Sequence, residues 1–207
     1  TLTSTLTPAA ICSKETFTYT PASSTNPLTI GWTRVPVAGI SGAASGTGNI
    51  SDVLINTTGS PISVTYELAL TPTGPGCNDT VDIVVQVNPQ PTATISGGGN
   101  TCLNSTDNLI VFTGANGTAP YTFTYNIDAN GPYTITTTSG NSIAVPSSSS
   151  TLGSTDYNLL SVKDFNECEQ SQSGTATIIV AAAPILIVTD PDPICENETY
   201  NLFANVS

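Results

Sequence analysis

Five cysteines carry the clearest chemical signal in this sequence of 207 residues: Cys12, Cys77, Cys102, Cys168 and Cys195. The first two are 65 residues apart and the next two 66, while the opening cysteine recurs after 90 and then 93 residues. This period predicts a tandem array with one disulfide per unit, Cys12–Cys77 and Cys102–Cys168. On this interpretation Cys195 opens a third unit and is unpaired by truncation.

Two other roles for these cysteines fit the sequence less well than disulfides. A metal site needs short Cys-x-x-Cys spacings or histidines, and the sequence contains neither. A catalytic thiol needs a neighbouring base to activate it, and none stands beside these cysteines. Disulfides form and persist in oxidising compartments, so the cysteine pattern indicates an extracellular protein.

Acidic residues supply the remaining candidates for chemistry. Asp190 and Asp192, each followed by proline, are candidate calcium ligands at a unit boundary, although calcium needs six or more oxygen ligands and Asp-Pro pairs are ordinary turn formers. Asp79 and Asp82 could form a catalytic carboxylate pair, but solvated charges at the start of a strand explain them better. We therefore expect no catalytic residue, no cofactor and no metal beyond this calcium candidate.

The charge composition excludes several functions. The chain has no histidine, three cationic and fifteen acidic residues, and a formal net charge of -12. Without histidine, the usual general base near neutral pH is missing. Three scattered cations cannot neutralise a phosphate backbone, so nucleic acid is not expected as a partner. No apolar run is long enough for a membrane span, so we expect no membrane insertion.

The elements that must position these residues are strands. Thr and Ser make up 57 residues, joined by 17 Asn, 17 Gly and 15 Pro, a composition that favours strands and turns over helices. Apolar residues alternate with polar ones over residues 62–70, 81–87, 121–127 and 176–180. Turn signals fall at 46–49, 72–76, 97–100, 130–132 and 139–141, and the serine run 147–150 indicates a loop. The predicted fold is all-β, with two-sheet sandwiches of about seven strands.

Prolines mark the predicted boundaries between units. The segment 88–91 closes a first unit over residues 1–89, and the segment 181–184 closes a second unit over residues 90–183. Residues 184–207 are then the start of a truncated third unit. Because the links are short and stiffened by proline, we expect limited motion between units and an extended rod.

Several short motifs in the sequence resemble those of a known family. They are Ile11-Cys12, Gly31-Trp32-Thr33-Arg34, Gly46-Thr47-Gly48-Asn49-Ile50, Leu54-Ile55-Asn56-Thr57-Thr58, Val85-Gln86-Val87-Asn88-Pro89 and, in the second unit, Phe112-Thr113-Gly114-Ala115-Asn116-Gly117. Together they resemble the PKD-like, immunoglobulin-like repeats of giant Bacteroidetes cell-surface adhesins, including those of gliding motility. No binding residue is transferred from that family, because the two units differ from each other.

The resemblance implies a function and a location. It implies a non-catalytic repeat segment of a secreted adhesin, exported by type IX secretion and displayed outside the cell as a filament attached to the outer membrane. The implied partners are neighbouring repeats of the same chain, surface polysaccharide and other cell-surface proteins. The segment Asp79-Thr80-Val81 resembles the acceptor for O-glycosylation in Bacteroidetes, which makes Thr80 a candidate acceptor.

The alternative function is an accessory module of a secreted enzyme, either a spacer or a carbohydrate-binding module. A sugar-binding face needs exposed aromatic rings. Trp32 is expected in the core against the disulfide, and Tyr66, Tyr121, Phe123 and Tyr125 fall in inward registers. The alternation assigns neither core nor surface to Tyr133, Tyr157 and Phe165. Tyr133 is therefore the residue whose replacement would test glycan binding.

Overall fold

The computed structural model describes residues 2–24, 28–42, 44–106, 108–188, 196 and 204–206, and these residues form strands, turns and loops without a helix. The predicted all-β class is therefore confirmed. No helix long and apolar enough to cross a membrane occurs among these residues.

The first seven strands form an N-terminal unit of two sheets. The larger sheet has the order β1-β7-β6-β3-β4, and the smaller sheet pairs β2 with β5. In both sheets the pairing is antiparallel except between β1 and β7, which run parallel. The strands are β1 Ile11–Cys12, β2 Thr16–Tyr19, β3 Leu28–Arg34, β4 Ser45–Thr47, β5 Ile50–Val53, β6 Ile62–Pro72 and β7 Asp79–Asn88.

The next nine strands form a C-terminal unit with the same plan. One sheet has the order β13-β10-β8 and the other the order β12-β11-β14-β16-β9, with β15 added at β14. The strands are β8 Thr92–Gly97, β9 Gly99–Cys102, β10 Leu109–Ala115, β11 Thr122–Ile127, β12 Asn130–Thr136, β13 Ser142–Pro146, β14 Gly153–Lys163, β15 Glu169–Ser171 and β16 Thr175–Ala181. Beyond this unit, β17 (Leu186–Val188) pairs with β18 (Ala204–Val206).

The alternating patterns lie where they were predicted, because each strand buries one face against the opposite sheet. In β6, Val64, Tyr66, Leu68 and Leu70 are buried. The predicted alternations in β7, β11 and β16 also become strands. The turn predicted at 130–132 is wrong by two residues. The chain reverses at Asp128, which adopts a left-handed φ of 53°, and β12 has already begun at Asn130.

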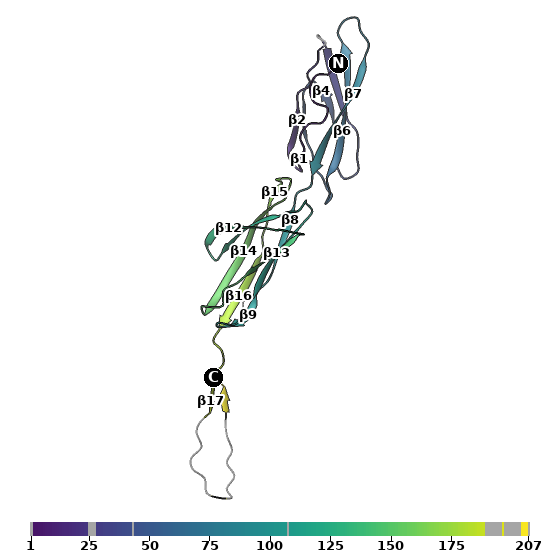
Figure 1. Cartoon of the computed structure of the whole chain (residues 1–207). Helices are drawn as coiled ribbons and strands as arrows, with labels where there is room; N and C mark the ends of the chain where they lie inside the picture. Colours follow the sequence, from purple (N-terminus) through teal and green to yellow (C-terminus); the bar gives the residue numbers. More distant parts are fainter. Residues whose placement is uncertain are drawn as a thin grey trace.

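Two separate hydrophobic cores fill the two units. The first contains Trp32, Tyr66 and their neighbours between Phe17 and Val87, and the second extends from Ala93 to Val180. The units follow one another end to end, with the N-terminus at the far end of the first and β17 beyond the second (Figure 1). The sheets of the first unit end at Asn88 and those of the second begin at Thr92, so three residues connect them.

Candidate functional site

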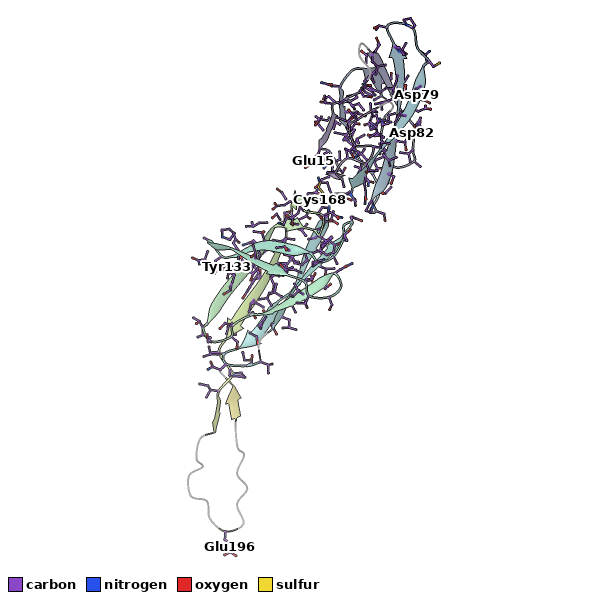
Figure 2. All side chains as sticks on the ribbon, turned by 45° about the horizontal axis from the view of Figure 1, so that its top comes forward. Glu15, Asp79, Asp82, Tyr133, Cys168 and Glu196 are labelled. Atoms are coloured by element: carbon purple, nitrogen blue, oxygen red, sulfur yellow. A yellow bond between two sulfur atoms is a disulfide. The ribbon has the colours of Figure 1, made fainter. Side chains whose placement is uncertain are left out.

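A disulfide joins the two units at their junction. Cys12 of β1 is bonded to Cys168, which follows β14, with a Cα–Cα distance of 5.5 Å and a sequence separation of 156 residues. Figure 2 labels Cys168 at the end of the C-terminal unit that faces the N-terminal unit, close to Glu15. The predicted pairs Cys12–Cys77 and Cys102–Cys168 are therefore wrong, and the structure leaves Cys77 and Cys102 unpaired and exposed.

Strand geometry explains why the predicted pairs cannot form. Cys12 lies opposite Asn88, the last residue of β7, whereas Cys77 precedes the first residue of that strand. The ten residues of β7 separate them by about 30 Å, at about 3.3 Å per residue. A disulfide needs Cα atoms within about 7 Å. Cys102 lies opposite Ala181 at one end of its unit and Cys168 follows Lys163 at the other, so the second pair fails for the same reason.

The turn after Cys12 holds the first sulfur in place. Ser13 donates its backbone N–H to Asn88 O over 2.8 Å, and Lys14 adopts a left-handed φ of 72°. The buried Ser13 hydroxyl accepts the Asn56 N–H over 3.0 Å, while the Asn56 amide donates to Val87 O over 2.9 Å. The Cys12 N–H is bonded to the Glu15 carboxylate over 2.8 Å. These contacts fix the turn to β7, which is the last strand of the unit.

Asp164 organises the loop that holds the second sulfur. Its side chain is 3% exposed, and Oδ1 accepts the N–H groups of Asn166 and Cys168, both over 3.0 Å. Oδ2 accepts the N–H of Thr118 over 2.9 Å, so the carboxylate ties this loop to the loop between β10 and β11. A carboxylate that accepts three backbone hydrogen bonds is a strong local organiser. It holds Cys168, which is itself fully buried.

The linker is packed between the units. Pro89 and Pro91 are buried, and Gln90 donates its side-chain amide to Ser13 O over 2.7 Å. Gly59 of the N-terminal unit lies so close to Asn116 of the C-terminal unit that a Cβ atom at Gly59 would be 2.7 Å from Asn116 Oδ1. A covalent bond, a hydrogen-bonded linker and the close approach of Gly59 to the Asn116 side chain therefore act together at this junction.

The other predicted site residues lie away from the junction. Asp79, Thr80 and Asp82 are exposed on β7, so Asp79 and Asp82 are solvated charges (Figure 2). The calcium candidates Asp190 and Asp192 lie outside the described residues, as does Cys195. Within the described residues, no group of three or more His, Cys, Asp or Glu side chains could hold a metal ion.

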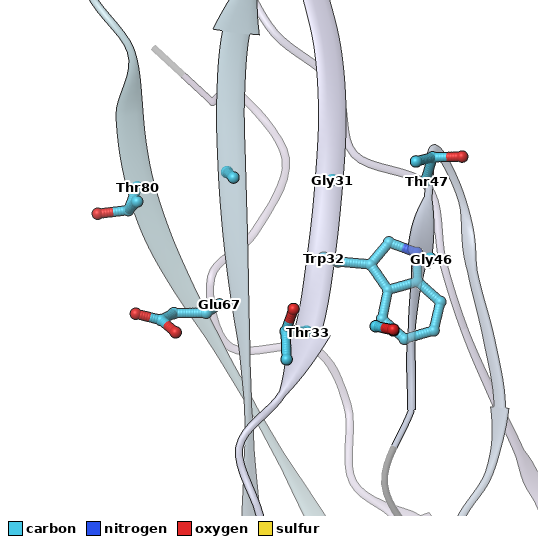
Figure 3. A pocket seen from close by; sticks show the side chains of 9 residues that line it. Gly31, Trp32, Thr33, Gly46, Thr47, Glu67 and Thr80 are labelled. Carbon is cyan, nitrogen blue, oxygen red and sulfur yellow. The ribbon is translucent and has the colours of Figure 1, made fainter.

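A shallow groove of about 490 Å³ crosses the outer face of β4, β3, β6 and β7. Its lining is mostly small and polar and includes Gly31, Thr33, Glu67, Ala69 and Thr80. Figure 3 shows Trp32 turned toward Gly46, away from Glu67 and Thr80. A Cβ atom at Gly46 would lie 2.7 Å from the Trp32 ring, so this position requires glycine. The groove has no pair of groups suited to acid–base chemistry, but it leaves the Thr80 hydroxyl accessible.

Aromatic residues divide between core and surface. Tyr66, Tyr121, Phe123 and Tyr125 are buried as predicted, and Tyr157 joins them. Trp32 is also buried, but it packs on Tyr66 at a ring-centroid distance of 5.8 Å rather than against the disulfide, which lies at the end of the unit. Tyr133 and Phe165 are 43% and 64% exposed.

A buried charge cluster stabilises the N-terminal core. Arg34 is 3% exposed, and its Nη1 lies 3.1 Å from Asp52 Oδ2. The same oxygen accepts the Tyr66 hydroxyl over 2.8 Å. Burial, and then the hydrogen bond to Asp52, raise the pKa of Tyr66 well above its ordinary value. No sequence pattern pointed to this cluster, because its members come from three strands that are adjacent only in the folded unit.

The described residues form two β-sandwich units of the immunoglobulin-like fold class. Residues 9–91 match the PKD-like domain family, which agrees with the resemblance found in the sequence for the N-terminal unit. No curated protein matches the chain. Among similar solved structures are the fibronectin(III)-like modules of Clostridium thermocellum CbhA, with 10% sequence identity, a TM-score of 0.38, and coverage of 88% of this chain and 94% of that one.

Proposed function

We propose that this chain is a non-catalytic repeat segment of a large secreted cell-surface adhesin. It serves as the stalk of a filament used for surface attachment and gliding motility. The motifs most resemble those of the gliding-motility adhesin SprB, and the PKD-like match over residues 9–91 supports the repeat class. The disulfide supports an oxidising, extracellular location. The net charge of -12 favours solubility and repulsion between neighbouring filaments.

The observation that carries this proposal is the position of the Cys12–Cys168 bond. Tension applied to the two ends of the segment passes from Cys12 directly to Cys168, so the 155 residues between them carry no load once the flanking chain is taut. All buried residues of the first core and nine of the twelve of the second lie within this protected stretch, and Ala176, Ile178 and Val180 of β16 lie outside it. The bond therefore suits a part that must keep its length under pulling, as a stalk must.

The experiment distinguishes spacing from binding in the full-length protein on intact cells. Residues 2–181 are replaced by an unrelated pair of immunoglobulin-like domains of equal length, and attachment and gliding are measured alongside antibody labelling of the cell surface. A stalk predicts normal surface labelling with attachment retained, while an in-frame deletion of the same residues lowers attachment. Loss of attachment in the replacement, with surface labelling intact, would show that the segment itself binds and would overturn the spacer role.

The exposed Tyr133 supports one alternative, an accessory carbohydrate-binding module of a secreted enzyme. Its ring packs against that of Tyr125 at a centroid distance of 5.8 Å and leaves exposed aromatic surface on which a sugar can stack. A glycan array gives the test. A specific ligand whose binding is abolished by Tyr133→Ala and retained in Phe165→Ala would favour this module, and the absence of any ligand would leave the stalk as the better account.

The modification of Thr80 is a separate part of the proposal. Its side chain is accessible at the edge of the groove, and Asp79 accepts the Thr80 N–H over 2.9 Å, which fixes the local Asp-Thr geometry. Intact-mass measurement of natively secreted protein, compared with Thr80→Ala, tests it. A glycan mass lost in the variant is the expected result, and an unmodified native mass would contradict it.

A further inference from the structure

Each unit carries one cysteine at each of its ends, and the two ends are chemically distinct. The cysteine of the first parallel strand, Cys12 or Cys102, lies at the end from which the chain leaves the unit. The cysteine between the last two long strands, Cys77 or Cys168, lies at the end where the chain enters. In the junction that the structure contains, an exit-end cysteine is bonded to the entry-end cysteine of the next unit.

The exit-end cysteines stand in the same local structure. Cys12 pairs with the last residue of β7, and Cys102 pairs with the last residue of β16, both in parallel register. Ser13 N–H donates to Asn88 O and Leu103 N–H to Ala181 O, each over 2.8 Å. The second residue after each cysteine, Lys14 or Asn104, has a left-handed φ, of 72° or 59°. Cys102 is therefore presented as Cys12 is, but it has no partner.

Apolar side chains lie near both unpaired cysteines. Leu109 and Leu152, near the exit end that carries Cys102, are each 53% exposed. Cys77 lines a hollow of about 210 Å³ at the entry end of the N-terminal unit, with Leu28, Pro72 and Pro75 among its walls. Apolar side chains at one end and a hollow at the other fit a joint between successive units.

We propose that Cys102 and Cys77 are each half of a disulfide of the Cys12–Cys168 kind. Cys102 bonds to the entry-end cysteine of a unit of this fold that follows, and Cys77 bonds to the exit-end cysteine of a unit that precedes. A disulfide then locks every joint between successive units. The inference rests on the proposed function only for its oxidising setting.

Bond formation needs a disulfide oxidant, for which oxidised glutathione serves. The thiolate of one cysteine attacks a glutathione sulfur, forming a mixed disulfide and releasing one glutathione thiolate. The thiolate of the second cysteine then attacks the first cysteine's sulfur in that mixed disulfide and releases the other glutathione. Two protein thiols lose two electrons and two protons, and one oxidised glutathione becomes two reduced molecules.

A tandem duplicate provides the test, because it places an entry end next to Cys102. Residues 1–184 are joined to a second copy beginning at residue 2, so that three residues, 182–184, replace the link formed by residues 89–91. The first copy carries Cys77→Ser, and the second carries Cys102→Ser and Cys195→Ser. Besides the Cys12–Cys168 bond of each copy, one candidate pair then remains, which is Cys102 of the first copy and Cys77 of the second. The protein is refolded in glutathione buffer, alkylated and mapped by mass spectrometry without reduction.

The expected result is a Cys102–Cys77 bond between copies and no alkylated thiol. Two alkylated thiols per molecule, with both Cys12–Cys168 bonds formed, would overturn the proposal. The control, in which Cys77→Ser is present in both copies, should leave one alkylated thiol, at Cys102. Because the oxidant is supplied, failure here refutes the locked joint while leaving the stalk function to its own test on cells.

A second assay tests the same proposal if the duplicate does not fold. Two separate chains, both with Cys195→Ser, are mixed in the same buffer, one carrying Cys77→Ser and the other Cys102→Ser. Head-to-tail docking predicts that Cys102–Cys77 heterodimers exceed the statistical twofold ratio over each homodimer. A statistical ratio would count against the proposal.

Discussion

Asp52 is a single side chain that satisfies two buried polar groups of the N-terminal core. It neutralises Arg34, which is nearly inaccessible to water, and accepts the Tyr66 hydroxyl. Removing one partner of a buried ion pair leaves an uncompensated charge and costs about 3–5 kcal/mol. The two partners lie on different sheets, Arg34 on β3 and Asp52 on β5, so the pair also joins the sheets across the core.

Asp52→Ala is therefore expected to lower the free energy of unfolding of the N-terminal unit by about 3–5 kcal/mol. Urea unfolding followed by fluorescence measures this selectively, because Trp32 is the single tryptophan and lies in that unit. Tyr66→Phe, which removes only the hydroxyl, is the matched control and should cost about 1–2 kcal/mol. A loss below about 1 kcal/mol in Asp52→Ala would contradict a structural role for the ion pair.

The raised pKa of Tyr66 predicts loss of stability in alkali. The folded state keeps the phenol proton at a pH where the unfolded chain, with the ordinary value of 10.0, releases it. The stabilisation is complete below about pH 10 and declines as pH rises above it, since the unfolded state then binds fewer protons. Trp32-monitored unfolding from pH 8 to 11 should show this decline in the native chain and a shallower one in Tyr66→Phe. Equal slopes would exclude Tyr66 as the source.

At the scale of elements, the loop from Asp164 to Cys168 decides how firmly the disulfide is held. One carboxylate organises the loop and ties it to Thr118. Gly117 fits between this carboxylate and the linker, since a Cβ there would be 2.9 Å from Asp164 Oδ2 and 3.1 Å from Pro91 Cβ. The loop, the neighbouring turn and the linker therefore behave as one packed element.

Asp164→Ala removes the acceptor of three backbone N–H groups and is expected to cost the C-terminal unit about 2–4 kcal/mol. Loosening of the loop should also expose the Cys168 sulfur, so that dithiothreitol reduces the bridge faster than in the native chain. Calorimetry and timed alkylation measure the two effects. Asp128→Asn is the control, because exposed Asp128 accepts one backbone N–H in another turn and asparagine tolerates the left-handed φ of this position. Equal reduction rates in both variants would rule out a special role for Asp164.

At the scale of the whole molecule, the Cys12–Cys168 bond sets how far the segment can extend. Pulled from its two ends, the oxidised chain extends only through residues outside the 156-residue separation. Reduction releases that stretch, which at about 3.3–3.6 Å per residue adds about 500–560 Å of contour length. Single-molecule force spectroscopy with and without reductant measures the difference.

The matched variant for this measurement is Cys12→Ser with Cys168→Ser, which should show the long contour even without reductant. Cys77→Ser should keep the short contour of the oxidised native chain, since Cys77 takes no part in the bond. A native contour that does not change on reduction would disprove the load-bearing bridge.

Local pattern and long-range pairing differ in how well the sequence predicts them. The alternation in residues 62–70 identified β6 and its buried face, because strand side chains alternate with a period fixed by the backbone. The turn signal at 72–76 also indicates that Cys77 lies at one end of a sheet. Cys12 lies in an opening strand, and the sequence does not place it at the same end. The Arg34–Asp52–Tyr66 cluster and the Asp164 loop gave no such signal, because their contacts join residues distant in the sequence.

The sequence by itself determined the all-β class, the burial of those aromatic residues that alternate with polar ones, the acidic charge and the presence of a disulfide, since composition, period and cysteine content depend on local chemistry. Only the tertiary structure decided which cysteines meet. Equal spacing within each unit suggested intra-unit bonds, but the length of a strand places those partners at opposite ends of a sandwich. The end of one unit instead touches the beginning of the next, and the bond forms where two sulfur atoms come within reach.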